Sequence, residues 1–80
     1  MKIQLYDRGL PQGKKLFANL DAICQRLQLD FPPEYIKDMN RVYNMGYQGN
    51  TILLINGEVV LIDQYPSPKE LEDIISENLK

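Results

Sequence analysis

The sequence contains very few of the residues that most often carry catalytic or metal-binding chemistry. It has one cysteine, no histidine and no tryptophan among 80 residues. A single cysteine cannot form a disulfide within the chain. Without histidine or further thiols, the usual zinc ligand sets cannot be assembled. We therefore expect no metal site and no cofactor.

Clustered positive charge and long apolar segments are also absent. Nine Lys and Arg oppose eleven Asp and Glu, which gives a net charge of −2, whereas nucleic acids and anionic membranes attract clustered basic residues. No apolar run approaches the roughly 18 residues of a membrane span, and Met1–Tyr6 lacks the apolar core of a signal peptide. The sequence therefore predicts a cytoplasmic protein that binds neither nucleic acid nor membrane.

The composition that remains is that of a small globular protein. Apolar residues make up 44% of the chain and charged residues 25%, both ordinary for a folded domain. Eighty residues are enough for one domain that buries roughly 60% of the surface of its unfolded chain. We expect a single domain over residues 1–80.

The first third of the chain changes from strand to helix periodicity. Lys2–Tyr6 alternates, with Ile3 and Leu5 on one face, as in a β-strand. Asp7–Gly13 is predicted to be a loop because glycine and proline interrupt it. Lys14–Leu27 is predicted to be a helix, since apolar residues recur at helical spacing along one stripe, formed by Leu16, Leu20, Ile23 and Leu27.

The middle of the chain predicts a short strand and a short helix. Phe31–Pro33 holds the backbone extended, and Glu34–Lys37 follows as a second strand. Asp38 is placed to cap a helix that continues to Asn44, with an apolar face of Met39, Val42 and Tyr43. Gly46 can end this helix in a left-handed conformation.

The last third predicts a hairpin and a capped helix. The apolar run Thr51–Ile55 suits a central strand. Asn56-Gly57 favours a type I′ turn that leads to a returning strand at Glu58–Ile62. Ser67-Pro68-Lys69-Glu70 reads as a capping box with proline at the first helical position. The helix that follows has an apolar stripe of Leu71, Ile74, Ile75 and Leu79.

The predicted order is βαβαββα. The first βαβ unit is expected to be parallel, and the hairpin adds an antiparallel pair. We therefore predict an α/β fold of four strands in a mixed sheet, with helices on both faces.

Several of these segments resemble a known family when taken together. They are Ile36–Met39, then Gly46, then the strand that ends Ile55-Asn56-Gly57, then Ser67–Glu70. Their order and spacing resemble the small prokaryotic glutaredoxin-like thioredoxins, also called redox-active disulfide proteins, over nearly the whole chain. The resemblance implies a thioredoxin-like fold.

The chain departs from this family at its reactive centre. The resemblance places the two cysteines of Cys-x-x-Cys at Leu10 and Gly13, and the cis-proline opposite them at Thr51. Without the two thiols we expect no dithiol oxidoreductase activity. We also predict a trans peptide between Asn50 and Thr51, because a cis bond without proline costs about 3–4 kcal/mol.

The leading functional hypothesis is a redox-inactive module that binds another protein through the former active-site groove. By the resemblance, an extended partner would pair with the backbone at Gly49-Asn50, with Tyr43, Tyr47 and Tyr65 as aromatic anchors. The predicted binding residues are Leu10, Pro11, Gln12, Gly13, Tyr47, Asn50 and Thr51. A small-ligand carrier using the same groove is a weaker hypothesis. We expect a monomer or a weak homodimer joined at a sheet edge.

The alternative hypothesis is a monothiol redox protein or sensor that uses Cys24. The competing interpretation places Cys24 in the core, since free cysteine is among the most buried residue types. The acidic residues form no defensible catalytic pair. Asp7 and Asp63 each follow a predicted strand, and we interpret them as loop or cap residues.

Overall fold

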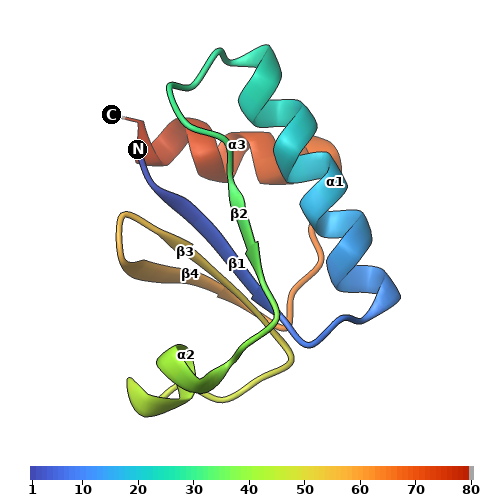
Figure 1. The fold of residues 1–80 in the computed structure, drawn as a ribbon. Helices are drawn as coiled ribbons and strands as arrows, with labels where there is room; N and C mark the ends of the chain where they lie inside the picture. The colour runs from blue at the N-terminus through green and yellow to red at the C-terminus, as the bar shows by residue number, and fades with distance from the viewer. Residues whose placement is uncertain (80) are drawn as a thin grey trace.

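The computed structural model describes residues 1–79 and contains a four-stranded mixed sheet with three helices (Figure 1). The strand order is β2-β1-β3-β4, with β1 parallel to β2 and β3 antiparallel to both of its neighbours. The predicted α/β architecture and element order are confirmed. In chain order, the elements are β1 Ile3–Asp7, α1 Pro11–Arg26, β2 Glu34–Ile36, α2 Asn40–Asn44, β3 Thr51–Ile55, β4 Glu58–Ile62 and α3 Pro68–Asn78.

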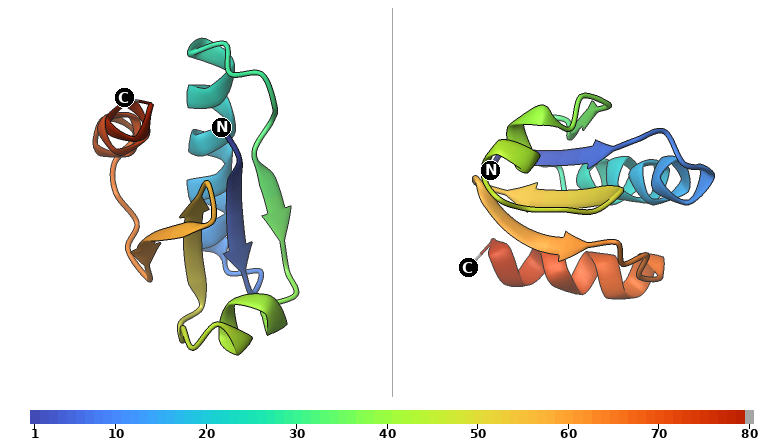
Figure 2. Two further views of the ribbon diagram at one scale, coloured as in Figure 1. Left: turned by 90° about the vertical axis from the view of Figure 1, so that its left-hand side faces the viewer. Right: turned by 90° about the horizontal axis from the view of Figure 1, so that it is seen from below.

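The helices cover the two faces of the sheet unequally. Helices α1 and α3 lie side by side. Helix α2 lies apart from both, near the end of the sheet at which β1 and β2 terminate (Figures 1 and 2). The larger core joins α1 and α3 to alternate residues of the strands, including Leu5 and Leu53. The smaller core lies on the opposite face, where Val42 of α2 packs near Tyr6 and Ile52. Alternation along β1 and β3 thus supplies both cores, which is why every residue of these strands is buried.

Two short sequence motifs, the Asn56-Gly57 turn and the Ser67–Glu70 capping box, adopt the structures predicted for them. Asn56 and Gly57 have φ of 53° and 84°, as a type I′ hairpin turn requires. The Ser67 hydroxyl accepts from the Glu70 N–H at 3.2 Å, and the Glu70 carboxylate accepts from the Ser67 N–H at 3.2 Å. Hydrogen bonding of the Glu70 carboxylate to the backbone and side chain of Ser67 lowers the pKa of Glu70. The capping box therefore begins α3 at Pro68, as predicted.

Strand β4 forms an irregular edge of the sheet. Its pairing with β3 shifts between Leu53 and Leu54, so Val60 is left over between Leu61 and Val59. A bulge on an edge strand disturbs the row of backbone groups that another strand would need. This irregularity makes β4 a poor template for continuous pairing with a second copy.

The structure corrects the predicted first residues of α1 and α2. Helix α1 begins at Pro11, so the predicted loop Asp7–Gly13 is wrong: Asp7 ends β1, and residues 11–13 form the first helical turn. Proline at the first helical position has the required φ, and Leu10 caps the helix through its extended backbone without a side-chain bond. Helix α2 begins at Asn40, not directly after Asp38, although the Asp38 carboxylate accepts from the Asn40 N–H at 2.9 Å.

Candidate functional site

A buried carboxylate stands at the junction of β1 and α1. Asp7 is fully buried, and one of its oxygens accepts from the Tyr35 hydroxyl at 2.6 Å and the Gly9 N–H at 3.1 Å. The other oxygen accepts from the Thr51 hydroxyl at 2.7 Å. The Thr51 oxygen lies 2.8 Å from the Tyr65 hydroxyl, which must be the donor because the single Thr51 proton goes to Asp7. We call these groups the Asp7 network.

The Asp7 network corrects the interpretation of Asp7 as a loop or cap residue. It joins the end of β1 to β2 through Tyr35, to β3 through Thr51, and to the β4–α3 loop through Tyr65. A buried carboxylate is costly unless hydrogen bonds compensate it, and here three donors do so. The network therefore fills, with hydrogen-bonded side chains, the junction where the family resemblance places a reactive dithiol.

Tyr35 is chemically altered by this arrangement. Burial, together with the hydrogen bond to Asp7 and the charge of that carboxylate, raises the pKa of Tyr35 to about 12. Deprotonation would place a phenolate against a carboxylate and break their short bond. The Phe17 ring packs beside Tyr35, with ring centroids 5.2 Å apart, and holds the phenol in place.

We predict that Tyr35 titrates about two pH units above an ordinary tyrosine. Because the folded pKa exceeds the unfolded value of about 10, the contribution of Tyr35 to stability is complete below pH 10. It is lost as the pH rises from about 10 to about 12. The check is phenolate absorbance during alkaline titration of wild type and Tyr35→Phe. A difference between them centred near pH 10 would contradict the shift.

Gly13 accommodates the buried carboxylate. It is buried in the first turn of α1, and a Cβ built on it would overlap the Asp7 carboxylate. The predicted site residues Gly13 and Thr51 are therefore both inaccessible to a partner, Thr51 being only 2% exposed. This part of the predicted docking surface is wrong, because the Asp7 network uses both residues internally.

The accessible part of the predicted site is a hollow between the β1–α1 loop and the α2–β3 segment. It has a volume of about 480 Å³. The Arg8 N–H donates to the Asn50 carbonyl at 3.0 Å, which ties its two sides together. We call it the Arg8 hollow, and it is lined by Arg8, Tyr43, Gly46, Tyr47, Gln48, Gly49 and Asn50.

Hydrogen bonds hold the wall of the Arg8 hollow in place. The Tyr43 hydroxyl donates to the Gly49 carbonyl at 2.8 Å. The Asp63 carboxylate accepts from the N–H groups of Asn50 at 2.7 Å and Thr51 at 2.9 Å. Every peptide bond within residues 1–79, including the one between Asn50 and Thr51, is trans, as predicted. The segment 46–50 is therefore shaped without a cis bond.

The remaining predicted residues lie elsewhere. Gln12 lines a second hollow of about 290 Å³, together with Lys15 and Tyr65 among others, between α1 and the segment before α3. Leu10 and Pro11 line neither hollow. The single groove predicted from the sequence is thus two separate hollows. Thr51 connects them, because it follows Asn50 of the first and bonds Tyr65 of the second.

Cys24 lies in the core of the α1 face. It is 2% exposed and packs among the buried residues shared by α1, α3 and the sheet. Burial, with the nearby negative charge of Asp21, raises the pKa of the Cys24 thiol. A redox-active cysteine needs the opposite, a lowered pKa and solvent access. The core interpretation of Cys24 is confirmed.

We predict that Cys24 reacts slowly with a thiol reagent in the native protein, and at the ordinary rate after unfolding. The measurement is the labelling rate near neutral pH, with and without denaturant. The native rate should fall at least tenfold, since reaction requires both opening of the core and ionisation of a raised-pKa thiol. Equal rates in the two states would contradict this placement.

The described residues form neither a recognisable metal centre nor a membrane-spanning helix. Within residues 1–79, no group of three or more His, Cys, Asp or Glu side chains is arranged to hold a metal ion. Over the same range, the helices are too short or too polar to cross a membrane.

Sequence analysis missed Arg8, Asp7 and Tyr35 as site residues. Asp7 could have been found from its position at the end of an alternating strand, together with a glycine at 13 in the following helix. Tyr35 lies 28 residues further along the chain, and no local pattern pairs it with Asp7. The sequence carries no signal for Arg8 beyond its charge.

Comparison with known proteins agrees with the fold. The chain is 29% identical over 76 residues to a protein named thioredoxin from Methanothermobacter thermautotrophicus, an alignment that covers 95% of this chain and 99% of that protein. No protein-family profile matches the chain, and no solved structure does. The sequence similarity covers nearly the whole chain that forms the βαβαββα architecture.

Proposed function

We propose that this thioredoxin-like protein binds another protein without dithiol chemistry and holds an extended segment of it in the Arg8 hollow. The observation that carries the proposal is the hollow itself, whose lining combines aromatic side chains with backbone groups that have no hydrogen-bond partner among residues 1–79. It adjoins the junction where the family resemblance places a reactive dithiol. The lone thiol lies in the core, away from this surface.

Backbone groups of the hollow support the binding of an extended chain. Within the described residues, the N–H groups of Gln48 and Gly49 make no hydrogen bond, whereas their neighbours in the segment are bonded. Unpaired backbone donors at an exposed edge are what an extended peptide uses to dock. Tyr47, 36% exposed, supplies the kind of aromatic surface that is enriched at interaction hot spots.

The alternative, a monothiol protein using Cys24, has no observation in its favour. The thiol is buried and its pKa is raised, so a thiolate would be scarce and shielded near neutral pH. A carrier of small ligands would need a more enclosed site than the open Arg8 hollow. Protein binding is therefore the function that the geometry supports best.

The test compares capture of partner proteins by wild type, Tyr47→Ala and Phe31→Ala. Phe31 is the matched control because it is an aromatic residue, 70% exposed, that lines a hollow elsewhere on the molecule. Tyr47→Ala should reduce capture about tenfold, as expected for an aromatic anchor, and Phe31→Ala should leave it unchanged.

Two results would count against the proposal. One is capture that survives Tyr47→Ala unchanged. The other is capture that disappears on adding reductant or in Cys24→Ser, which would favour the monothiol alternative. Clear disulfide reductase activity of the wild type would likewise overturn the view that no thiol chemistry takes place.

A further inference from the structure

We infer that the segment bound in the Arg8 hollow carries a side-chain carboxylate, which pairs with the Arg8 guanidinium. The inference rests on the proposed function and specifies the chemistry of the partner. Of the described residues that line this hollow, Arg8 alone is charged. The other lining groups are aromatic rings, amides and glycine backbone, so Arg8 decides which charge the hollow accepts.

The guanidinium of Arg8 is not satisfied within the protein. Its one side-chain hydrogen bond is a long one, donated to the Asn50 side-chain carbonyl at 3.5 Å. Among residues 1–79, the ion pair found joins Arg26 and Glu72, so no described carboxylate lies within 4.0 Å of Arg8. An arginine with five N–H donors and a single weak contact has capacity left for an external acceptor.

Three acidic side chains, at the end of β1 and after β2 and β4, accept hydrogen bonds within the protein. Asp7 is buried and accepts three hydrogen bonds. Asp63 accepts from two backbone N–H groups beside the hollow. Asp38, after β2, accepts from the N–H of Asn40. Among residues 1–79 no carboxylate lies within 4.0 Å of the Arg8 guanidinium, so a partner's carboxylate would meet a cation that has no ion-pair partner in the described part of the protein.

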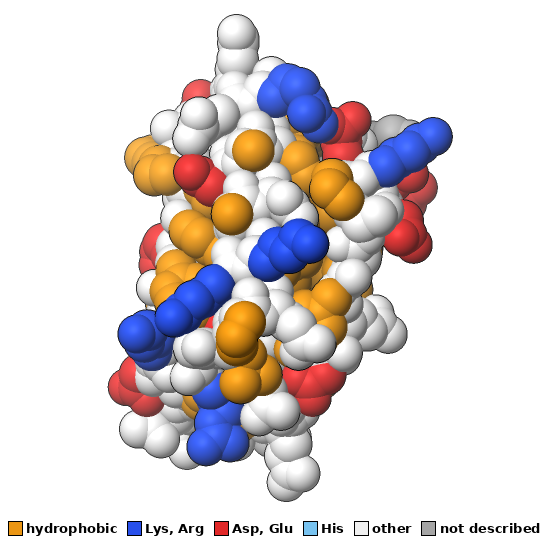
Figure 3. Space-filling view, turned by 90° about the vertical axis from the view of Figure 1, so that its right-hand side faces the viewer, with side chains coloured by type: hydrophobic (Ala, Val, Ile, Leu, Met, Phe, Trp, Pro, Cys, Tyr) orange, Lys and Arg blue, Asp and Glu red, His pale blue; other side chains and the backbone are white. Residues whose placement is uncertain are grey.

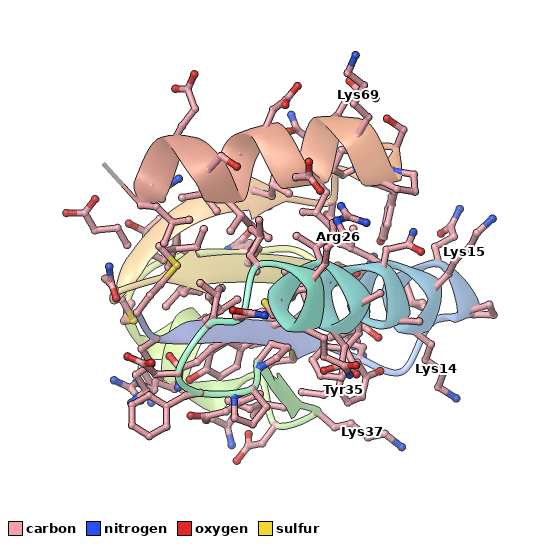
Figure 4. The ribbon with its side chains drawn as sticks, turned by 90° about the horizontal axis from the view of Figure 1, so that it is seen from above. Lys14, Lys15, Arg26, Tyr35, Lys37 and Lys69 are labelled. Carbon is pink, nitrogen blue, oxygen red and sulfur yellow. The ribbon has the colours of Figure 1, made fainter. Side chains whose placement is uncertain are left out.

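Further positive side chains lie outside the hollow, on α1 and directly after β2. Lys14 and Lys15 extend from the first turns of α1, which hold no acidic residue. Figure 4 shows Lys14 and Lys37 extending on the same side of the molecule as Tyr35. Figure 3 shows Lys and Arg side chains distributed over the face that carries α1, with acidic side chains toward its margins. These charges favour the approach of an acidic segment, although screened by salt.

The form of the surface favours a protein segment over a free small anion. Tyr47 lines both the Arg8 hollow and a neighbouring hollow of about 410 Å³ along β4, where Val59 and Ile62 are also found. In a segment that binds Arg8 through a carboxylate, a neighbouring apolar residue would therefore pack over Tyr47 and β4. A planar guanidinium can bind a carboxylate through two parallel hydrogen bonds, which fixes the direction of the segment.

Selection from a displayed library of random peptides tests the inference. Immobilised wild type, Arg8→Gln and Lys69→Gln are screened in parallel. Lys69→Gln removes the same charge from α3 (Figure 4). Peptides recovered on wild type and Lys69→Gln should be enriched in Asp or Glu beside an apolar residue. Synthetic versions of these peptides should bind Arg8→Gln about tenfold more weakly than they bind wild type. Versions in which Gln replaces the acidic residue should bind wild type about tenfold more weakly.

The outcomes separate the inference from the proposed function. Peptides that lose binding in Tyr47→Ala, yet show no acidic preference, would overturn the carboxylate and leave the proposed function standing. Failure to recover any peptide sensitive to Tyr47→Ala would overturn both. Equal competition by sodium acetate at the peptide's own concentration would identify a site for small anions and overturn the inferred protein segment.

Discussion

Replacing Gly13 by alanine is expected to destabilise the protein by about 3 kcal/mol, the upper part of the range for overpacking a buried site. The added Cβ would overlap the Asp7 carboxylate. This carboxylate cannot withdraw easily, because Tyr35, Thr51 and Gly9 all donate to it. For a domain whose total stability is on the order of 4–12 kcal/mol, such a loss is large. Chemical denaturation of the purified variant measures it.

The control for this experiment is the neighbouring residue in the same helical turn. Gln12 is exposed, so Gln12→Ala should change the free energy of unfolding by no more than about 0.5 kcal/mol. If the carboxylate is the obstacle, Gly13→Ala combined with Asp7→Ala should be more stable than the sum of the two single effects predicts. Additive losses would show that Gly13 is required for another reason.

The close approach of Asp7 to Gly13 also changes the interpretation of the positions that the resemblance assigns to a dithiol. The resemblance assigns a cysteine to position 13, which would need space there for a side chain. Here that space holds the carboxylate of Asp7, with a threonine and two tyrosines bonded around it. The junction is therefore filled and internally satisfied. A surface used for binding has to lie beside it, as the Arg8 hollow does.

Local chemistry explains which parts of this fold could be predicted from the sequence. The Asn56-Gly57 turn and the Ser67–Glu70 capping box are short-range devices, and both form as expected. The alternating strand at β1 and the apolar run at β3 define their own periods. The start of α1 was missed because Leu10 offers no side-chain cap, and the only signal, Pro11, also suits a loop.

The candidate site was less predictable because its contacts are long-range. Asp7 bonds Tyr35 and Thr51, which lie 28 and 44 residues away. The resemblance placed Gly13 and Thr51 on the surface of a groove, whereas both are buried. Only the packing shows that these two residues face the buried carboxylate. Tyr47 and Asn50 do line the accessible hollow, since they precede the buried strand β3.

The second large effect is expected at Asp7 itself, where the nature of the replacement should decide the outcome. Asp7→Ala removes the acceptor for the Tyr35 hydroxyl, the Thr51 hydroxyl and the Gly9 N–H. Buried donors without a partner cost about 1–3 kcal/mol each, less where water can reach them. We expect a total loss of about 3–4 kcal/mol on the same grounds. Asp73→Ala, which changes an exposed acid in α3, should cost about 0.5 kcal/mol or less.

Asp7→Asn should instead cost only about 1 kcal/mol, because the amide can satisfy every partner. Its oxygen can accept from Tyr35 and Gly9, and its NH₂ can donate to Thr51. The Thr51 hydroxyl then donates to Tyr65, so the direction of that hydrogen bond reverses. Because the neighbouring charge is gone, the pKa of Tyr35 should fall from about 12 toward its ordinary value.

Denaturation and alkaline titration of Asp7→Ala and Asp7→Asn together decide between two roles for this carboxylate. If Asp7 serves as an acceptor that holds four segments together, Asn preserves the fold while the Tyr35 pKa moves. If its negative charge is itself required, Asn should be as damaging as Ala, and the network would then be stabilised mainly by electrostatic attraction. The first outcome is the one that the geometry favours, since each oxygen of Asp7 has its own donors and no cation lies within ion-pair distance of it among residues 1–79.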